Sequence, residues 1–187
     1  MGVRLIVVII LMAACAPATT SATPSPTPTP TPTPSPSPSP AIGDACLVGR
    51  WVDQKQSAPG NWTWSNERIA VSGLQGFVIT YTAAGLETDD FSAAQPLVGD
   101  FHGHQIKIAL GGLLTYQVLA DGSHIVQSNA AGSLTGTYYY DGVVQPGGTA
   151  TAPAGTIAYT CSGNTLHLES PAGDPAYGPQ LDDLTRG

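Results

Sequence analysis

The 187-residue sequence carries little charge, and positive charge is especially scarce. Charged residues make up 10% of the chain, with six Lys and Arg against thirteen Asp and Glu. From Ala41 onward there are five basic and thirteen acidic residues, a formal charge of −8. Nucleic-acid binding depends on basic surfaces that attract phosphates, and anionic lipid attracts polybasic segments. The composition therefore excludes a nucleic-acid partner and a purely electrostatic attachment to membranes.

A hydrophobic run long enough to cross a membrane is also missing. The apolar run at 5–12 is far shorter than the ~20 residues of a membrane-spanning helix. It follows one basic residue, Arg4, and precedes two small ones, Ala13 and Ala14. This order of basic start, short apolar stretch and small residues is that of a secretory signal.

The residue after the two alanines is Cys15. A small-small-Cys ending resembles the lipobox of bacterial lipoproteins, in which the signal is cut before the Cys and its thiol is diacylated. The resemblance implies a signal peptide at 1–14, palmitate-type acylation at Cys15 and a lipid anchor on the extracytoplasmic face of the cell membrane. Two or more acyl chains anchor stably, whereas one binds only marginally. The alternative is an ordinary secretory signal that happens to precede a cysteine.

The segment 15–40 is dominated by proline, which stands at every even position from Pro24 to Pro40. Each proline fixes its own φ and pushes the preceding residue toward extended conformations. We therefore expect a disordered, proline-rich linker of polyproline II character, on the order of 55 Å long over residues 23–40. It would separate the anchor from a single folded domain at 41–187.

Cysteine is rare, with three residues in the chain. Apart from Cys15, only Cys46 and Cys161 remain, and an exported compartment permits disulfides. We predict one disulfide between them, which would tie the first strand to the penultimate long one as in a barrel that closes on itself. Two buried free thiols are the alternative. The paired spacing of a zinc site is absent from the sequence.

Helical periodicity is lacking after Cys46, where period-two alternation punctuated by turn residues repeats many times. The predicted strands are 47–52, 61–64, 69–72, 77–82, 105–110, 113–119, 124–127, 134–140, 156–161, 165–169 and 181–185. Residues 147–155 are interpreted as a long flexible connection. Eight to ten short strands with local turns favour an all-β, antiparallel barrel or sandwich. The predicted disulfide favours the barrel.

Both ends of the domain are similar to lipocalins and to bacterial lipocalin-like lipoproteins. Gly49-Arg50-Trp51 resembles their Gly-x-Trp opening, the run 159–168 their terminal hairpin and Leu184-Thr185-Arg186 their last strand. The resemblance implies a lipocalin-like barrel whose closed end is plugged by Trp51. It also implies that Arg186 packs over that ring in a cation–π contact.

Residues suited to catalysis are few. His102 and His104 share a face of an extended chain but lack a sufficient ligand set, so we expect polar histidines in a loop and no metal. The run Glu87-Thr88-Asp89-Asp90 is interpreted as a solvated turn. Since no phosphate-binding glycine motif is present, we expect neither a cofactor nor an enzyme.

Trp62 and Trp64 are two residues apart and would show both indoles on one side of an extended strand. They suit stacking on a sugar or covering a ligand mouth, and packing as core is the alternative. The leading hypothesis is thus a membrane-anchored lipoprotein that binds a small apolar or sugar-like ligand. The alternatives are a non-catalytic envelope interaction module with a solid core and, last, a hydrolase using Asp89 or His104. The sequence leaves the oligomeric state open.

Overall fold

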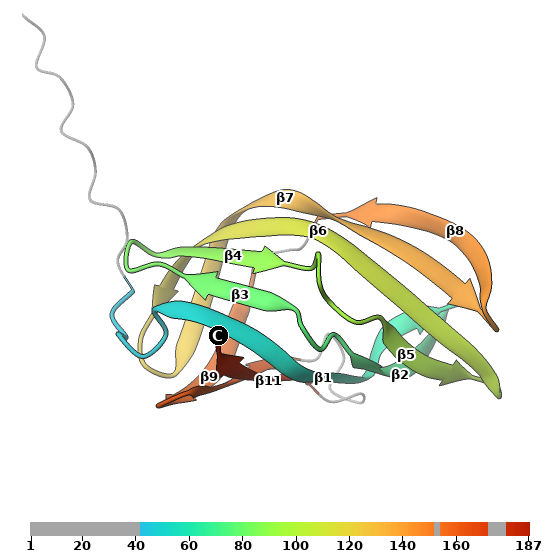
Figure 1. Ribbon diagram of the computed structural model, residues 1–187, viewed down its shortest axis with the longest axis horizontal. Helices are drawn as coiled ribbons and strands as arrows, with labels where there is room; N and C mark the ends of the chain where they lie inside the picture. Colours follow the sequence, from blue (N-terminus) through green and yellow to red (C-terminus); the bar gives the residue numbers. More distant parts are fainter. Residues whose placement is uncertain (1–41, 152–153, 172–178) are drawn as a thin grey trace, which may run out of the picture. The chain divides into compact units, whose positions relative to one another are not determined.

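The computed structural model describes residues 42–151, 154–171 and 179–187, all within one compact unit, Ser37–Gly187 (Figure 1). The predicted signal, the lipid-attachment residue Cys15 and the linker lie outside the described residues. Those that are described form eleven strands and no helix, so none of them belongs to a helix that could cross a bilayer.

The strands differ widely in length. They are β1 Gly49–Trp64, β2 Glu67–Gly73, β3 Val78–Tyr81, β4 Leu86–Asp90, β5 Leu97–Phe101, β6 His104–Ala120, β7 His124–Tyr140, β8 Val143–Ala150, β9 Thr156–Ser162, β10 Thr165–Ser170 and β11 Gln180–Arg186. The long strands β1, β6 and β7 each contact different partners along their two halves.

Eight strands close into an antiparallel barrel, which confirms the predicted fold class. Strand β1 pairs with β3 on one side and with β11 on the other. The remaining wall runs β3–β4–β6–β7–β9–β10–β11, each pair antiparallel. Trp51 stands opposite Ile79 of β3 and Arg186 of β11, so the first and last strands are neighbours. Closure leaves no free sheet edge around this part of the molecule.

The other three strands extend the wall beyond the barrel at its second end. The far half of β1 forms a hairpin with β2, β2 pairs with β5, and β5 with the first half of β6. The far half of β7 forms a hairpin with β8. This open sheet continues one side of the barrel (Figure 1, right). The strand β8 replaces the flexible connection expected at 147–155, and that prediction was wrong over 147–150.

Alternation of apolar residues produces the core as predicted. Phe77, Ile79 and Tyr81 are all buried, and so are Ile106 and Ile108 on β6. The strands β6 and β7 are nevertheless single elements of seventeen residues, where the sequence predicted two short strands in each. Gly112 and Gly132 have φ of +113° and +90°, and a Cβ there would lie 2.3 Å and 2.1 Å from carbonyl oxygens of the facing strand. Glycine at these two positions therefore allows the pairing of β6 with β7 to continue, whereas the sequence pattern predicted that the strands end there.

Residues 42–48 cover the end of the barrel at which β1 begins. The amide of Ile42 donates to Ala83 in the β3–β4 turn, and Asp44 accepts a 2.7 Å hydrogen bond from the Tyr159 hydroxyl on β9. The buried side chain of Leu47 belongs to the same core as Trp51. Residues 42–48, called here the covering segment, therefore close this end of the barrel through hydrogen bonds and apolar packing.

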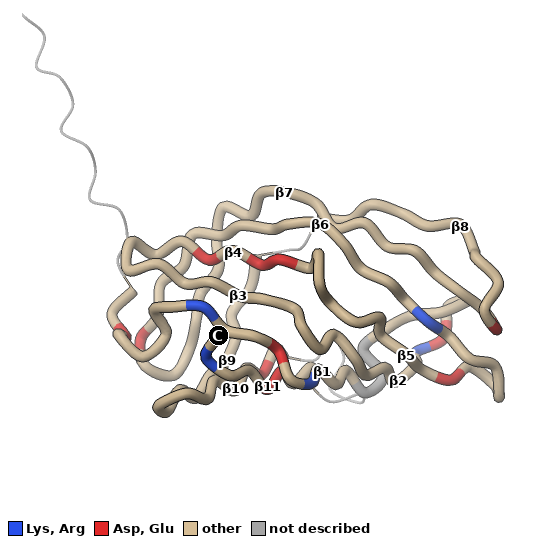
Figure 2. The backbone as a smooth tube through the Cα atoms, viewed as in Figure 1, with Lys and Arg blue, Asp and Glu red and all other residues tan. Residues whose placement is uncertain are grey.

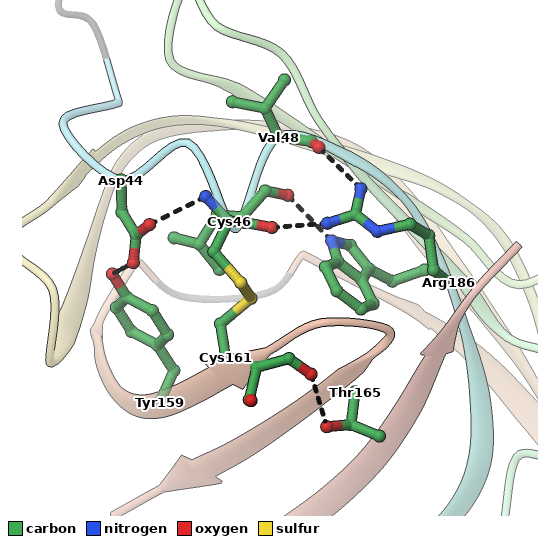
Figure 3. The surroundings of a disulfide bond; sticks show 10 residues. Asp44, Cys46, Val48, Tyr159, Cys161, Thr165 and Arg186 are labelled. Atoms are coloured by element: carbon green, nitrogen blue, oxygen red, sulfur yellow. Dashed lines mark hydrogen bonds between the residues drawn. A yellow bond between two sulfur atoms is a disulfide. The ribbon is translucent and has the colours of Figure 1, made fainter.

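The predicted disulfide between Cys46 and Cys161 is present, with the two Cα atoms 6.1 Å apart (Figure 3). Its topological role differs from the expectation. Cys46 lies in the turn before β1, and Cys161 is on β9, which is separated from β1 by β10 and β11. The bond therefore fastens the covering segment across the barrel end, while backbone pairing of β1 with β11 closes the wall.

Trp51 and Arg186 contact each other as the lipocalin resemblance implied. The Trp51 ring is fully buried, and its Nε1 donates a 2.8 Å hydrogen bond to the Leu47 carbonyl. The guanidinium of Arg186 donates to the carbonyl oxygens of Val48 and Cys46 at 3.0 and 2.8 Å (Figure 3). It thereby holds the end of β11 against the covering segment.

Candidate functional site

A band of polar side chains lies inside the barrel, beyond the apolar closed end. Five buried polar or charged residues occur among those described: Asp53, Gln56, Glu87, Asp89 and Asp182, with exposures of 0 to 8%. They come from β1, β4 and β11. Acidic positions on β4 stand out in Figure 2. The interpretation of 87–90 as a solvated turn was therefore wrong, because this segment is a strand that faces inward at Glu87 and Asp89.

Glu87 and Asp89 form a coupled carboxyl pair. Burial, followed by the charge of Asp89, raises the pKa of Glu87 well above its usual range. Burial also raises the pKa of Asp89 to about 7, although a hydrogen bond from Glu87 opposes that rise. Glu87 Oε1 accepts a 2.8 Å hydrogen bond from Gln127. Burial thus favours the protonated form of both carboxyl groups.

Asp53 and Asp182 extend the acidic band to the opposite wall. Burial, and then the charge of Asp182, raises the pKa of Asp53 to about 7. Burial raises the pKa of Asp182 to about 6, against hydrogen bonds from Gln56 and Gln180. No described Lys, Arg or His is buried, so no cation of the chain offsets these carboxylates inside the barrel.

The barrel-mouth cleft opens above this acidic band. It encloses about 370 Å³ and lies where the barrel passes into the open sheet. Its polar lining comes from Gln56, Asp89, Thr151 and Gln180, and its aromatic lining from Trp62, Phe91 and Tyr116. Pockets for small ligands generally enclose ~300–1,000 Å³ and combine apolar walls with a few polar groups. The barrel-mouth cleft has this size and composition.

A second hollow, the aromatic groove, lies farther out on the open sheet. It encloses about 610 Å³ and is lined by residues that include Trp64, Tyr138 and Tyr140. The ring of Trp64 stacks on Tyr140 with centroids 6.2 Å apart, and its centroid is 6.1 Å from that of Tyr138. A smaller hollow lined by both Trp62 and Tyr138 connects the groove to the barrel-mouth cleft.

The two predicted ligand residues thus lie in different parts of a continuous surface. Trp62 lines the barrel-mouth cleft, and Trp64 lines the aromatic groove. Both are half-buried and pack against the edge of the core. Each tryptophan thus lines a hollow and also belongs to the apolar packing, the two roles that the sequence left open. Asp89, Gln56 and Gln180 were not anticipated as lining residues. Asp89 and Gln56 have polar neighbours on both sides in the sequence, so hydrophobic alternation gave no signal of their inward orientation.

His102 and His104 lie at the turn between β5 and β6 and are exposed. His102 Nε2 is 2.9 Å from Glu67, whereas His104 Nδ1 is 2.7 Å from Asp141. The two rings therefore contact different carboxylates. Within the described ranges no three His, Cys, Asp or Glu residues are placed to hold a metal ion together.

The chain matches no protein-family model, no curated protein and no solved structure.

Proposed function

We propose that the protein is a non-enzymatic, lipid-anchored binding protein that takes up a small ligand in the barrel-mouth cleft. The cleft itself carries this proposal, because it is a hollow of ligand size that opens into the interior of an otherwise packed barrel. Barrels of eight strands are either filled by side chains or hold one small ligand. Here the closed end is filled around Trp51, and space remains at the mouth.

The lining suits an amphipathic ligand with an apolar or sugar-like body. The indole of Trp62 and the rings of Phe91 and Tyr116 present flat apolar surfaces. Gln56 and Gln180 contribute side-chain amides to the lining. The lipobox resemblance supports a location on the extracytoplasmic face of the membrane, with the lipocalin resemblance supporting a ligand inside the barrel.

The experiment measures binding of the uncharged dye Nile red to residues 16–187, a form that keeps the whole compact unit and its disulfide. Dye fluorescence is expected to rise on binding to the wild type. The substitution Ala150→Trp places an indole where Ala150 lines the cleft and should reduce binding. Val144→Trp lies on the same strand, is 63% exposed and should have no effect. No fluorescence rise, or equal binding by both variants, would contradict the proposal.

A second candidate is recognition of an envelope polymer by the aromatic groove. The stacked rings of Trp64 and Tyr140 favour it, since they form an open platform of the kind on which sugar rings or an extended chain can lie. Retention of the protein on envelope preparations should be lost in Trp64→Ala and kept in Ala150→Trp. Equal retention of Trp64→Ala and the wild type would reject this candidate.

A further inference from the structure

The polar lining of the barrel-mouth cleft includes two hydrogen-bond acceptors that no described donor reaches. Gln180 Nε2 donates to Asp182 Oδ2 at 3.2 Å, and Gln56 also hydrogen-bonds Asp182. Gln56 Oε1 is left without any donor among the described residues, although the side chain is only 4% exposed. Asp89 Oδ1 likewise has no hydrogen-bond donor among the described residues. Both residues line the cleft.

Such acceptors are costly when buried without a donor. A buried polar group without a hydrogen bond costs ~1–3 kcal/mol, and a charged one costs more. The site is therefore incomplete unless something that enters it brings donors. A protonated amine suits this need, because an ammonium group carries three donors and no acceptor.

Charge favours the same chemistry. Asp89 lines the cleft and the carboxyl groups of Asp182 and Asp53 lie behind it, with no buried Lys, Arg or His among the described residues. An anion would meet this field unfavourably, and a neutral hydroxyl would leave it uncompensated. A cation that enters the cleft offsets it directly.

The walls favour an organic cation over a metal ion. The described carboxylates do not form a set of three around one point. The rings of Trp62, Phe91 and Tyr116 line the same cleft and can contact both an apolar body and an adjacent positive charge. Cations over aromatic faces gain ~0.5–2 kcal/mol, and the volume of about 370 Å³ leaves room for a single small aromatic amine.

We propose that the barrel-mouth cleft binds a small organic ammonium ion, with Asp89 as its charged partner and Gln56 Oε1 as a second acceptor. This inference rests on the proposed binding function and names the ligand class. The apolar part of the ligand lies against Trp62, and the ammonium group points toward the interior of the barrel.

The test uses three probes of nearly identical shape: 2-phenylethylamine, 2-phenylethanol and phenylacetate, which are cationic, neutral and anionic at pH 8. Their affinities for residues 16–187 are measured by titration calorimetry. The amine is expected to bind about ten- to hundredfold more tightly than the alcohol, the difference that a hydrogen bond to a charged group supplies. The acid should bind most weakly of the three.

Two matched variants locate the effect. Asp89→Asn should remove most of the preference for the amine, measured within this variant as the ratio of the affinities for 2-phenylethylamine and 2-phenylethanol. Asp90→Asn makes the same charge change one residue away, where the carboxylate accepts a hydrogen bond from the Ser92 amide at the surface, and should preserve the preference. Loss of the preference in both variants would mean that general surface charge attracts the amine, and would overturn the assignment to Asp89.

Binding of the amine should also release protons, since an added positive charge favours ionised carboxyl groups. Its affinity should therefore rise between pH 5.5 and pH 8. The groups that face the site are Asp53, Tyr81, Glu87, Asp89, Tyr116 and Asp182, with Asp183 and His167 on the outer side of Asp182. An affinity that is independent of pH would contradict the proposal.

The outcomes separate this inference from the proposed function. Equal binding of amine and alcohol, together with Nile red binding that Ala150→Trp abolishes, would reject the ammonium ligand and retain the cleft as a neutral site. Failure of the three probes with Nile red binding intact would likewise reject the ammonium ligand. Absence of all binding would reject both.

Discussion

The guanidinium carbon of Arg186 lies 4.3 Å from the centroid of the Trp51 ring, so the last strand of the barrel packs over the first. The same guanidinium donates two hydrogen bonds to the covering segment. One side chain thus connects β11, β1 and the residues that close the barrel end.

Replacing this arginine should loosen the closed end. Arg186→Ala removes the cation–π contact and both hydrogen bonds, for an expected loss of about 2 kcal/mol in the free energy of unfolding. Arg186→Lys keeps the charge but not the planar fork and should lose about half as much. Urea unfolding measures both, with Arg50→Ala on the exposed side of β1 as control. A loss of stability no larger than that of the control would show that the contact contributes nothing to the free energy of unfolding.

The disulfide should contribute most of its stabilisation through the unfolded chain. It closes a loop across a sequence separation of 115 residues, for which the chain-entropy model gives about 4.7 kcal/mol. We expect the double variant Cys46→Ser, Cys161→Ser to lose about 3–5 kcal/mol and yet keep its strand signal in circular dichroism. The wall is closed by β1–β11 pairing and not by the sulfur atoms.

Reductant provides the control for this prediction. It should lower the urea midpoint of the wild type to that of the double variant and leave the variant unchanged. A double variant that unfolds at the wild-type midpoint, or one that loses its strand signal altogether, would contradict the assigned role.

Alternation and the two ends of the domain could be predicted from sequence because both depend on local patterns. Phe77, Ile79 and Tyr81 were placed on one face by period two, and they are buried. The contact between Trp51 and Arg186 followed from resemblance. The number of strands and their turns predicted a barrel or a sandwich, and the predicted disulfide favoured the barrel, although pairing of β1 with β11 is what closes the wall.

The acidic interior could not be predicted, for a physical reason. Glu87 and Asp89 belong to residue types that are normally exposed to solvent, so the sequence pattern of several acidic residues after a glycine predicts a turn. Their burial depends on residues far away in sequence, such as Gln127 at 2.8 Å from Glu87. Asp182 comes from the other end of the domain. The pattern of a single sequence does not show which residues far apart in the chain will contact each other in the fold.

The length of β6 and β7 was not predicted because glycine occurs both in turns and inside long paired strands. Gly112 and Gly132 resemble turn residues, whereas here they permit close contact between two long strands. The separate settings of Trp62 and Trp64 were missed for a related reason. The strand β1 leaves the barrel and enters the open sheet between its register shift near Ala58 and its end at Trp64.

The proposed lipid anchor gives a prediction that is independent of the barrel. Cys15→Ala should move the protein from the membrane fraction to the soluble exported fraction, because the thiol that accepts the acyl chains is lost. Fractionation with immunodetection measures this change. A matched Ala16→Ser variant should stay with the membrane. Membrane retention of Cys15→Ala would show that another part of the chain provides the attachment.

The buried carboxyl groups predict that the domain loses stability as the pH rises. The pKa values of Asp53 and Asp89 are raised to about 7 and that of Asp182 to about 6, chiefly by burial. In the unfolded chain these groups ionise near pH 4. Between about pH 4 and pH 7 the folded state therefore binds more protons than the unfolded state. Its stability is full below this window and falls on passing through it.

Asp53→Asn tests this sign. Asp53 Oδ1 accepts a hydrogen bond from the Lys55 amide at 2.7 Å, which the amide oxygen of Asn can retain, whereas Oδ2 has no donor among the described residues. The variant should be more stable than the wild type at pH 8 by about 2 kcal/mol, nearly equal to it at pH 4, and less dependent on pH between the two. Asp100→Asn, an exposed position near the end of β5, should keep the wild-type dependence. Urea unfolding at pH 4, 6 and 8 measures all three proteins. A wild type that gains stability from pH 4 to pH 8 would mean that the interior carboxylates are stabilised as anions.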